Sequence, residues 1–233
     1  MNEIRSRKPL ALLAASLALT APALSHAQQS PWYVGAALGQ SKASSDLVRD
    51  RESNIAPGTP STLATSSDLK DTAGKLWVGY QALPWLAIEG GYADLGKQRI
   101  TTDYILNFGG TVSTGTVTTD RKIDGWGLDL VASAEVTTGL RLFGKLGAFR
   151  ADITTDTRVS NGGSFQNQIG DFLSAGDSET VVKYGLGAQY AFTKNVSARL
   201  EWERLPKLGE PGSAAKTGEA DQDTFWLGVN YRF

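Results

Sequence analysis

Charged side chains recur at every second position in several segments of this sequence, a spacing that brings them to one face of a β-strand. In VSARLEWERL, for example, three charged residues occupy alternate positions and apolar residues lie between them. The residues that the alternation places on such a face are Glu89, Asp129, Arg141, Lys145, Lys183, Arg199, Glu201 and Glu203. Acids and bases enclosed together must pair, because an unpartnered buried charge is costly. The chemistry that these residues predict is therefore ion pairing in a polar interior.

Residue types that usually perform catalysis are scarce. The chain has 233 residues, no Cys and one histidine, His26. Without Cys there is no disulfide, thiolate metal site or thiol nucleophile, and histidine is the usual general base and a common zinc ligand. We therefore expect no enzymatic activity, no cofactor and no bound metal. An enzyme that works with Asp, Glu, Ser and Lys alone, such as a hydrolase, is the alternative.

Residues 1–27 have the organisation of a secretory signal peptide. A basic stretch precedes an apolar run at 10–19, and SHA, which ends at Ala27, is a small-x-small cleavage site. The alternative is an inner-membrane anchor helix, but the run is shorter than the ~20 residues that a spanning helix needs. We expect an exported mature domain at 28–233, from which His26 has been removed.

Charge and hydropathy exclude two further classes of protein. Cleavage of the leader removes three bases and one acid from 23 Lys+Arg and 24 Asp+Glu, which leaves a net charge of −3. This charge gives no reason to expect nucleic acid as a partner. A mean hydropathy of −0.21 is too polar for a bundle of membrane-spanning helices.

Hydrophobicity alternates with a period of two along the mature chain, in segments of about ten residues, the length of a tilted membrane-spanning strand. Eight such segments are expected at 32–41, 72–81, 85–95, 121–134, 140–151, 180–191, 196–205 and 223–233. Short connections alternate with long ones rich in Ser, Thr, Gly and Asp; the long ones are 42–71, 96–120, 152–179 and 206–222. The sequence therefore predicts an all-β fold, an eight-stranded antiparallel up-and-down transmembrane β-barrel.

A soluble sandwich or lipocalin-like barrel would also alternate, with its apolar residues inside. Two features favour the membrane barrel. Gly and Ala are frequent on the polar face, as a narrow lumen requires, and aromatic residues lie near the segment ends, as in a membrane girdle. The aromatic residues are Trp32, Tyr80, Tyr92, Tyr190, Trp202, Tyr231 and Phe233.

Several stretches resemble the OmpA-like eight-stranded outer-membrane barrel family. GAQYAFTKNVSARLEWERL at 187–205 and WLGVNYRF at 226–233 are similar to its closing strands, WYVGAALGQ at 32–40 to its first strand and IEGGYADLG at 88–96 to its third. The resemblance implies a structural protein integral to the outer membrane, with outer-membrane lipid around it. The chain stops at Phe233, so the peptidoglycan-binding domain of longer family members is not expected.

The resemblance also implies an interior ion pair between Glu89 and Arg199, which in the family blocks or gates a water path. In the family, the gating ion pair exchanges partners with a further acid and a further base. This chain has Gln189 and Val131 at those two positions, which is a departure from the family's pattern. Eight strands leave room for side chains rather than an open channel. A satisfied polar core is therefore one interpretation, and a small gated pore is the other.

The closing segment resembles the family at its end as well. Val229, Tyr231 and Phe233, at alternate positions, are similar to the signal that the family presents to the barrel-assembly machinery. This resemblance implies that the assembly machinery is a partner of the chain.

The second long connection continues the alternation beyond the membrane-length segments. The stretch from 99 to 122 centres on Gly109-Gly110, a two-residue hairpin signal, so the third and fourth strands are expected to project as a ribbon near 100–119. An exposed ribbon edge is a template for a partner's strand. An adhesin or host-interaction barrel with an extracellular ligand is therefore a further hypothesis, and Ser/Thr-rich loops that are simply solvated are its alternative.

Overall fold

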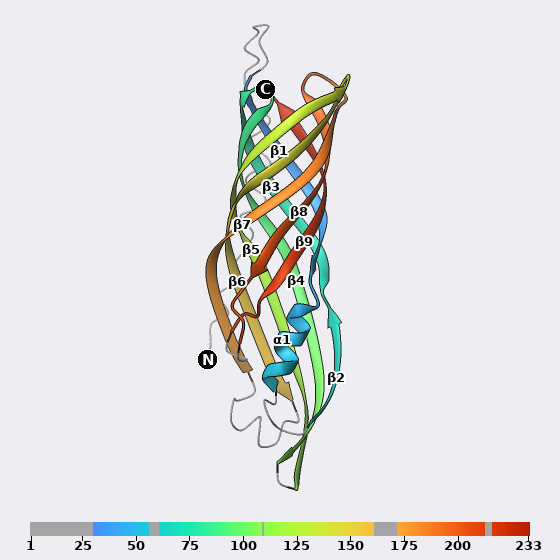
Figure 1. The fold of residues 1–233 in the computed structure, drawn as a ribbon, viewed down its shortest axis with the longest axis vertical. Coiled ribbons are helices and arrows are strands. Elements are labelled where there is room, and N and C mark those ends of the chain that lie inside the picture. Colours follow the sequence, from blue (N-terminus) through green and yellow to red (C-terminus); the bar gives the residue numbers. More distant parts are fainter. Residues whose placement is uncertain (1–29, 56–60, 109, 161–171, 213–215) are drawn as a thin grey trace, which may run out of the picture.

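Long antiparallel strands make up most of the described molecule. The computed structural model describes residues 30–55, 61–108, 110–160, 172–212 and 216–233, so the predicted leader lies outside the described residues. The elements are β1 (Trp32–Ala43), α1 (Asp46–Ile55), β2 (Ser61–Asp68), β3 (Lys70–Leu83), β4 (Leu86–Phe108), β5 (Thr111–Thr137), β6 (Leu140–Ser160), β7 (Phe172–Ala191), β8 (Val196–Leu208) and β9 (Ala220–Arg232). Figure 1 shows the strands wound into a tall barrel.

Eight of the nine described strands close into a ring. Hydrogen-bonded neighbours follow one another in the order β1, β3, β4, β5, β6, β7, β8 and β9, and every pair is antiparallel. The ring closes because β9 pairs with β1 from Arg232↔Tyr33 to Gln222↔Ala43. Closure satisfies the backbone groups that an open edge would expose to lipid. The predicted eight-stranded up-and-down barrel is confirmed.

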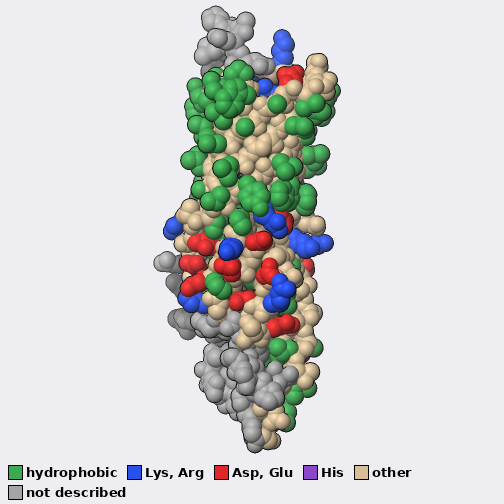
Figure 2. Space-filling model, viewed as in Figure 1, with side chains coloured by type: hydrophobic (Ala, Val, Ile, Leu, Met, Phe, Trp, Pro, Cys, Tyr) green, Lys and Arg blue, Asp and Glu red, His purple; other side chains and the backbone are tan. Residues whose placement is uncertain are grey.

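The period-two alternation sorts side chains onto the two faces of the barrel wall. Large apolar side chains point outward, and Leu38, Trp126 and Phe225 are 70%, 65% and 65% exposed. Figure 2 shows the apolar side chains around one half of the barrel and charged side chains gathered beyond them. We call this half the apolar band. An apolar exterior of this extent fits hydrocarbon and excludes the soluble sandwich and the lipocalin-like barrel.

Three tight connections mark one end of the barrel, which we call the turn end. They are Pro84-Trp85, Thr138-Gly139 and 192–195, each within or beside the short connections expected from the sequence. Gly139 has a φ of 81°, a conformation that glycine adopts without strain. The turn end is uppermost in Figure 1, and the opposite end, which we call the loop end, lies below.

β4 and β5 continue past the apolar band as a projecting ribbon. Their pairing runs to Phe108↔Thr111, as a two-residue connection requires, although Gly109 itself lies outside the described residues. The ribbon is therefore confirmed, and the prediction of a loop over 96–120 was wrong. The prediction of a loop over 152–179 was also too wide, because β6 and β7 enter it from both sides. Threonine and valine keep the alternation going where the hydrocarbon-facing leucines stop.

The edges of this ribbon are mostly occupied by the chain's own strands. β2, which lies within the first predicted loop, pairs with β4 as far as Ser61↔Leu106. β6 pairs with β5 as far as Ser160↔Thr116. The exposed template that the sequence suggests is therefore limited, among the described residues, to short stretches at the tip. The helix α1 is ten residues long, and none of the described helices is long and apolar enough to cross a membrane.

Candidate functional site

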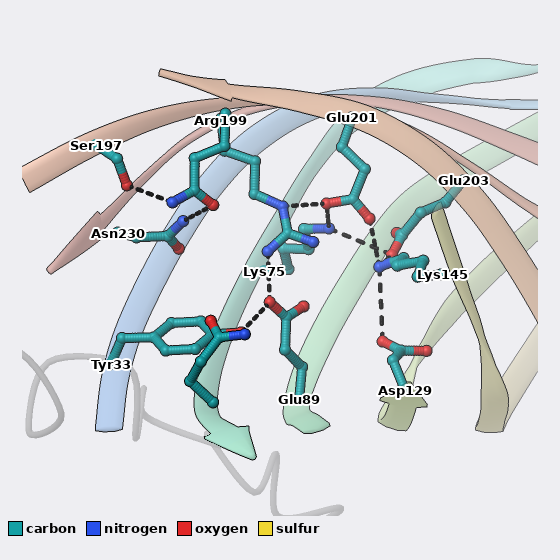
Figure 3. A network of polar contacts seen from close by, with 12 residues as sticks. Tyr33, Lys75, Glu89, Asp129, Lys145, Ser197, Arg199, Glu201, Glu203 and Asn230 are labelled. Carbon is teal, nitrogen blue, oxygen red and sulfur yellow. Dashed lines mark hydrogen bonds and ion pairs between the residues drawn. The ribbon is translucent and has the colours of Figure 1, made fainter. Parts of the chain in front are cut away.

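A balanced set of eight charged side chains fills part of the barrel lumen. They come from the six strands β3 to β8. The members labelled in Figure 3 point toward one another. The members are Lys75, Glu89, Asp129, Lys145, Lys183, Arg199, Glu201 and Glu203, which we call the interior ionic cluster. Each side chain is at most 10% exposed, and four bases face four acids. The cluster is therefore neutral as a whole.

Arg199 lies between two carboxylates at one side of the cluster. Its Nη1 donates to Glu89 Oε1 at 2.5 Å, and its Nε lies 3.0 Å from Glu201 Oε2. The Tyr33 hydroxyl donates to the same Glu89 oxygen at 2.7 Å. The guanidinium carbon also lies 4.1 Å from the centroid of the Phe143 ring. This cation therefore has ionic, hydrogen-bonding and aromatic partners at once, which compensates for its removal from water.

Lys145 lies near three carboxylates of the cluster. Its Nζ contacts Glu201 and Glu203 and lies 3.5 Å from Asp129 Oδ2. Lys183 Nζ approaches the same Asp129 oxygen at 2.8 Å. Lys145 is thus the cation with the most carboxylate neighbours in the cluster.

Lys75 belongs to the interior ionic cluster, although it is not among the residues predicted from the sequence. Its Nζ donates to Glu201 Oε2 at 2.8 Å and to Glu203 Oε1 at 3.2 Å, and Trp226 Nε1 donates to Glu203 Oε2 at 2.5 Å. Lys75 and the buried Trp77 are two positions apart on β3, so their side chains point to the same, inward face of the strand. The alternation in the segment 72–81 is therefore the sequence signal that indicates Lys75 as an inward charge.

Arg141 is the predicted residue that the structure leaves outside the cluster. Its Nη2 donates to the carbonyl oxygen of Pro84 at 2.7 Å, near the turn end. Arg141 precedes Lys145 by four residues, which is about 13 Å along a strand. The period-two alternation places Arg141 on the inward face of its strand. It carries no information about the height of Arg141 along the barrel axis.

The two departures from the family's pattern make no ion pair among the described residues. Gln189 donates to Ser197 Oγ at 2.9 Å and accepts from Asn230 Nδ2 at 3.0 Å. Val131 is 6% exposed and belongs to the apolar core. Neither residue offers Arg199 or Glu89 a charged partner, so the second carboxylate on Arg199 is Glu201 instead.

Cavities lie on both sides of Glu89. One, of about 220 Å³, opens toward the turn end and is lined by Arg199 and Asn230 as well as Glu89. The other, of about 30 Å³, is lined by Lys75 and Lys145 together with Glu89. The smaller volume suits roughly one water molecule. The interior ionic cluster therefore narrows the lumen between the cavity of about 220 Å³ and the cavity of about 30 Å³.

A second polar layer fills the lumen on the loop-end side. Arg121 Nη1 donates to Gln98 Oε1 at 3.1 Å, and Arg121 Nη2 donates to the carbonyl oxygen of Leu208 at 2.8 Å. Gln98 donates to Gln222 Oε1 at 3.1 Å, and Gln222 donates in turn to Ser41 Oγ at 2.5 Å. The alternation of charged residues gives no signal for this layer, because most of its members are uncharged and lie in or beside the predicted loops.

Outside the apolar band, one carboxylate is held in its charged form. Arg99 donates to both oxygens of Asp120, at 2.6 and 3.1 Å. This hydrogen bonding, opposed by partial desolvation and assisted by the nearby charge of Lys97, lowers the pKa of Asp120. The ion pair ties β4 to β5 where the ribbon leaves the membrane.

The charges of the interior ionic cluster are paired with one another. Each carboxylate of the interior ionic cluster faces at least one cation. Within the described ranges, no three residues among His, Cys, Asp and Glu are grouped so that they could hold a metal ion.

Of the three residues of the proposed assembly signal, Val229 and Tyr231 lie on the outer face of β9, and Phe233 directly follows the last residue of that strand. Val229, Tyr231 and Phe233 are 54%, 46% and 40% exposed. The rings of Tyr231 and Phe233 meet edge to face with centroids 5.5 Å apart. These side chains form an accessible apolar row at the turn end.

A comparison with protein families gives one match that spans almost the entire chain. The model of the outer membrane protein beta-barrel domain matches residues 11–233. Outer membrane protein A of Serratia marcescens is 27% identical over 88% of this chain and 50% of its own length. Outer membrane protein A of Yersinia pseudotuberculosis serotype I (strain IP32953) is 28% identical over 96% of this chain and 54% of its own length. The chain therefore spans about half the length of the curated relatives it matches.

Solved structures resemble this barrel at low identity. The outer membrane protease OmpT from Escherichia coli is 12% identical, with a TM-score of 0.49, 90% of this chain covered and 99% of that chain covered. A likeness this distant carries no information about activity.

Proposed function

Because this chain belongs to the outer membrane protein beta-barrel domain family, we propose that it is a structural, non-enzymatic barrel integral to the outer membrane. The observation that carries the proposal is the neutral interior ionic cluster, which stabilises the lumen of a closed ring with an apolar exterior. The acids and bases of the cluster form ion pairs with one another, which supports a structural role over a catalytic one. The surrounding lipid is the partner that the apolar band requires.

We propose that residues 1–27 are removed on export and that the turn end faces the periplasm. An epitope inserted at Gly110, at the tip of the ribbon, should then be labelled by antibody on intact cells. The same epitope inserted between Thr138 and Gly139 should be labelled only after the cells are permeabilised. The reverse pattern would show that the barrel has the opposite orientation.

We also propose that the ribbon of β4 and β5 contacts an extracellular or host-surface ligand. Ile105 and Val112 near its tip are 50% and 61% exposed, although they lie beyond the apolar band. Exposed apolar side chains outside the membrane are candidate contact points. Cells that carry Ile105→Asn and Val112→Asn should adhere less to host matrix, and unchanged adhesion would favour a simply solvated ribbon.

A small gated pore is the second candidate function, supported by the cavities on the two sides of Glu89. Under the structural proposal, both the wild-type barrel and Arg199→Ala should leave the conductance of a planar bilayer at the level of the lipid alone. The reason is that Lys75, Lys145 and the polar layer around Arg121 still fill the lumen. Discrete openings in Arg199→Ala that are absent from the wild type would favour the pore.

Deleting Phe233 should impair assembly, because it ends the outward-facing row that resembles the family's recognition signal. The expected result is unassembled chain in the periplasm and a strongly reduced heat-dependent mobility shift of the outer-membrane fraction in electrophoresis. The control replaces Phe192, an aromatic residue that is 64% exposed in a turn, by alanine, and it should leave the barrel yield near the wild-type level. A normal yield after the deletion would contradict the assembly role.

A further inference from the structure

The lumen widens at the turn end into a polar cavity, which we call the vestibule. It has a volume of about 220 Å³ and ends at Glu89 and Arg199 of the interior ionic cluster. Since a water molecule occupies about 30 Å³, the vestibule has room for several waters or for one small polar ligand. Figure 3 shows Tyr33 and Asn230, two of its lining residues, on the opposite side of Arg199 from Glu203.

The vestibule carries an excess of positive charge, in contrast to the neutral interior ionic cluster. Its charged lining residues are Arg141, Lys194, Arg199, Arg232 and Glu89, four bases and one acid. Glu89 already accepts hydrogen bonds from Arg199 and Tyr33. Like charges repel, and Arg141 and Arg232 both line this cavity. No second carboxylate lies among the described lining residues, so an anion would relieve this repulsion.

Buried polar atoms at the vestibule lack partners within the described structure. Arg141 Nε is a shielded donor without a hydrogen-bond acceptor, and Asn230 Oδ1 is a shielded acceptor without a donor. Asn230 is only 3% exposed. A buried polar group without a partner is costly, so a ligand or water that reaches these two atoms would be stabilised.

We propose that the vestibule is a binding site for a phosphate group. Guanidinium donors match the geometry of phosphate oxygens. The unpartnered acceptor of Asn230 favours a ligand that also carries a hydroxyl donor over a simple carboxylate. Free phosphate supplies that donor as the hydroxyl of its monoanion. A phosphatidylglycerol headgroup that reaches over the rim of the barrel has no hydroxyl on its phosphodiester and would supply the donor from its glycerol. This inference concerns binding alone and stands apart from the structural role of the cluster.

Titration calorimetry of the refolded barrel in maltoside detergent tests the proposal. Inorganic phosphate should bind saturably with one site per barrel, whereas sodium chloride at the same ionic strength should give no such signal. The double variant Arg141→Gln, Arg232→Gln should bind at least tenfold more weakly. Arg150→Gln, which removes an exposed outward-facing charge from the same strand as Arg141, is the control and should bind as the wild type does. Non-saturable heats, or equal weakening in the control, would show an adventitious ion only and overturn the proposal.

Amide chemical-shift mapping on the unmodified barrel keeps the proposal testable if the double variant fails to fold. Phosphate should shift the amides of Asn195, Ser197 and Asn230 and leave those of the β4–β5 ribbon unchanged. Shifts confined to the ribbon or to the charges beyond the apolar band would overturn the site. Dihexanoyl phosphatidylglycerol below its micelle concentration distinguishes the sources. If it displaces phosphate, the headgroup is the ligand, and if it does not, free phosphate is.

Discussion

Arg199→Ala should lower the free energy of unfolding of the refolded barrel by about 3 to 5 kcal/mol. The substitution removes the cation that joins Glu89 to Glu201 and leaves Glu89 with the Tyr33 hydroxyl alone. It also removes the guanidinium from the Phe143 ring, which adds a packing loss. Chemical denaturation of the barrel in lipid vesicles, followed by tryptophan fluorescence, measures the change.

Substitution of Glu89, the ion-pair partner of Arg199, tests whether the two residues stabilise one another. Glu89→Ala should cost less than Arg199→Ala, because Arg199 keeps Glu201 as a carboxylate partner. The double variant should lose clearly less than the sum of the two single losses, because the orphaned charge disappears with its partner. The control Arg150→Ala removes an exposed charge and should change stability by about 0.5 kcal/mol or less. Additive losses would show that Glu89 and Arg199 do not stabilise one another.

The barrel itself could be predicted from the sequence because its signal is repeated along the chain. Each strand has a hydrocarbon-facing row and an inward row, and a one-residue error would exchange the two. Seven of the eight residues proposed for the interior ionic cluster meet in the structure for the same reason. Their common parity placed them on the inward face, and a narrow lumen brings inward residues from neighbouring strands together.

Arg141 shows what parity leaves undetermined. Arg141 has the correct face but the wrong height. It lies four residues from Lys145 on β6, and only the register and tilt of the neighbouring strands, which no local pattern encodes, decide which of these two heights the carboxylates share. Lys75 lies on the inward face of the segment 72–81, so the same alternation that indicates the other members indicates Lys75 as well. The loop boundaries were wrong for a further reason: a strand outside the membrane needs no apolar face, so its end is set by partner strands such as β2 and β6.

Lys145→Met should destabilise the barrel as strongly as the loss of Arg199, by about 3 to 5 kcal/mol. Lys145 contacts Asp129, Glu201 and Glu203, and its removal leaves four acids facing three bases in a poorly hydrated lumen. Methionine preserves most of the side-chain volume, so the loss reports charge rather than a cavity. The measurement is the denaturant concentration at the midpoint of unfolding. It is made on barrel whose heat-dependent mobility shift in electrophoresis shows correct assembly.

A second substitution separates charge imbalance from lost packing. Glu203→Gln added to Lys145→Met restores three acids to three bases, and the amide oxygen can still accept from Trp226 Nε1 as the carboxylate does. The double variant should therefore recover part of the lost stability, although Glu203→Gln alone in the wild-type background leaves a base in excess and should destabilise it. Lys122→Met is the matched control, because Lys122 is half exposed and lies 3.5 Å from Asp94; its loss should cost only about 0 to 1 kcal/mol. If the double variant is less stable than Lys145→Met, the cluster is held by its hydrogen-bond geometry and not by its neutrality.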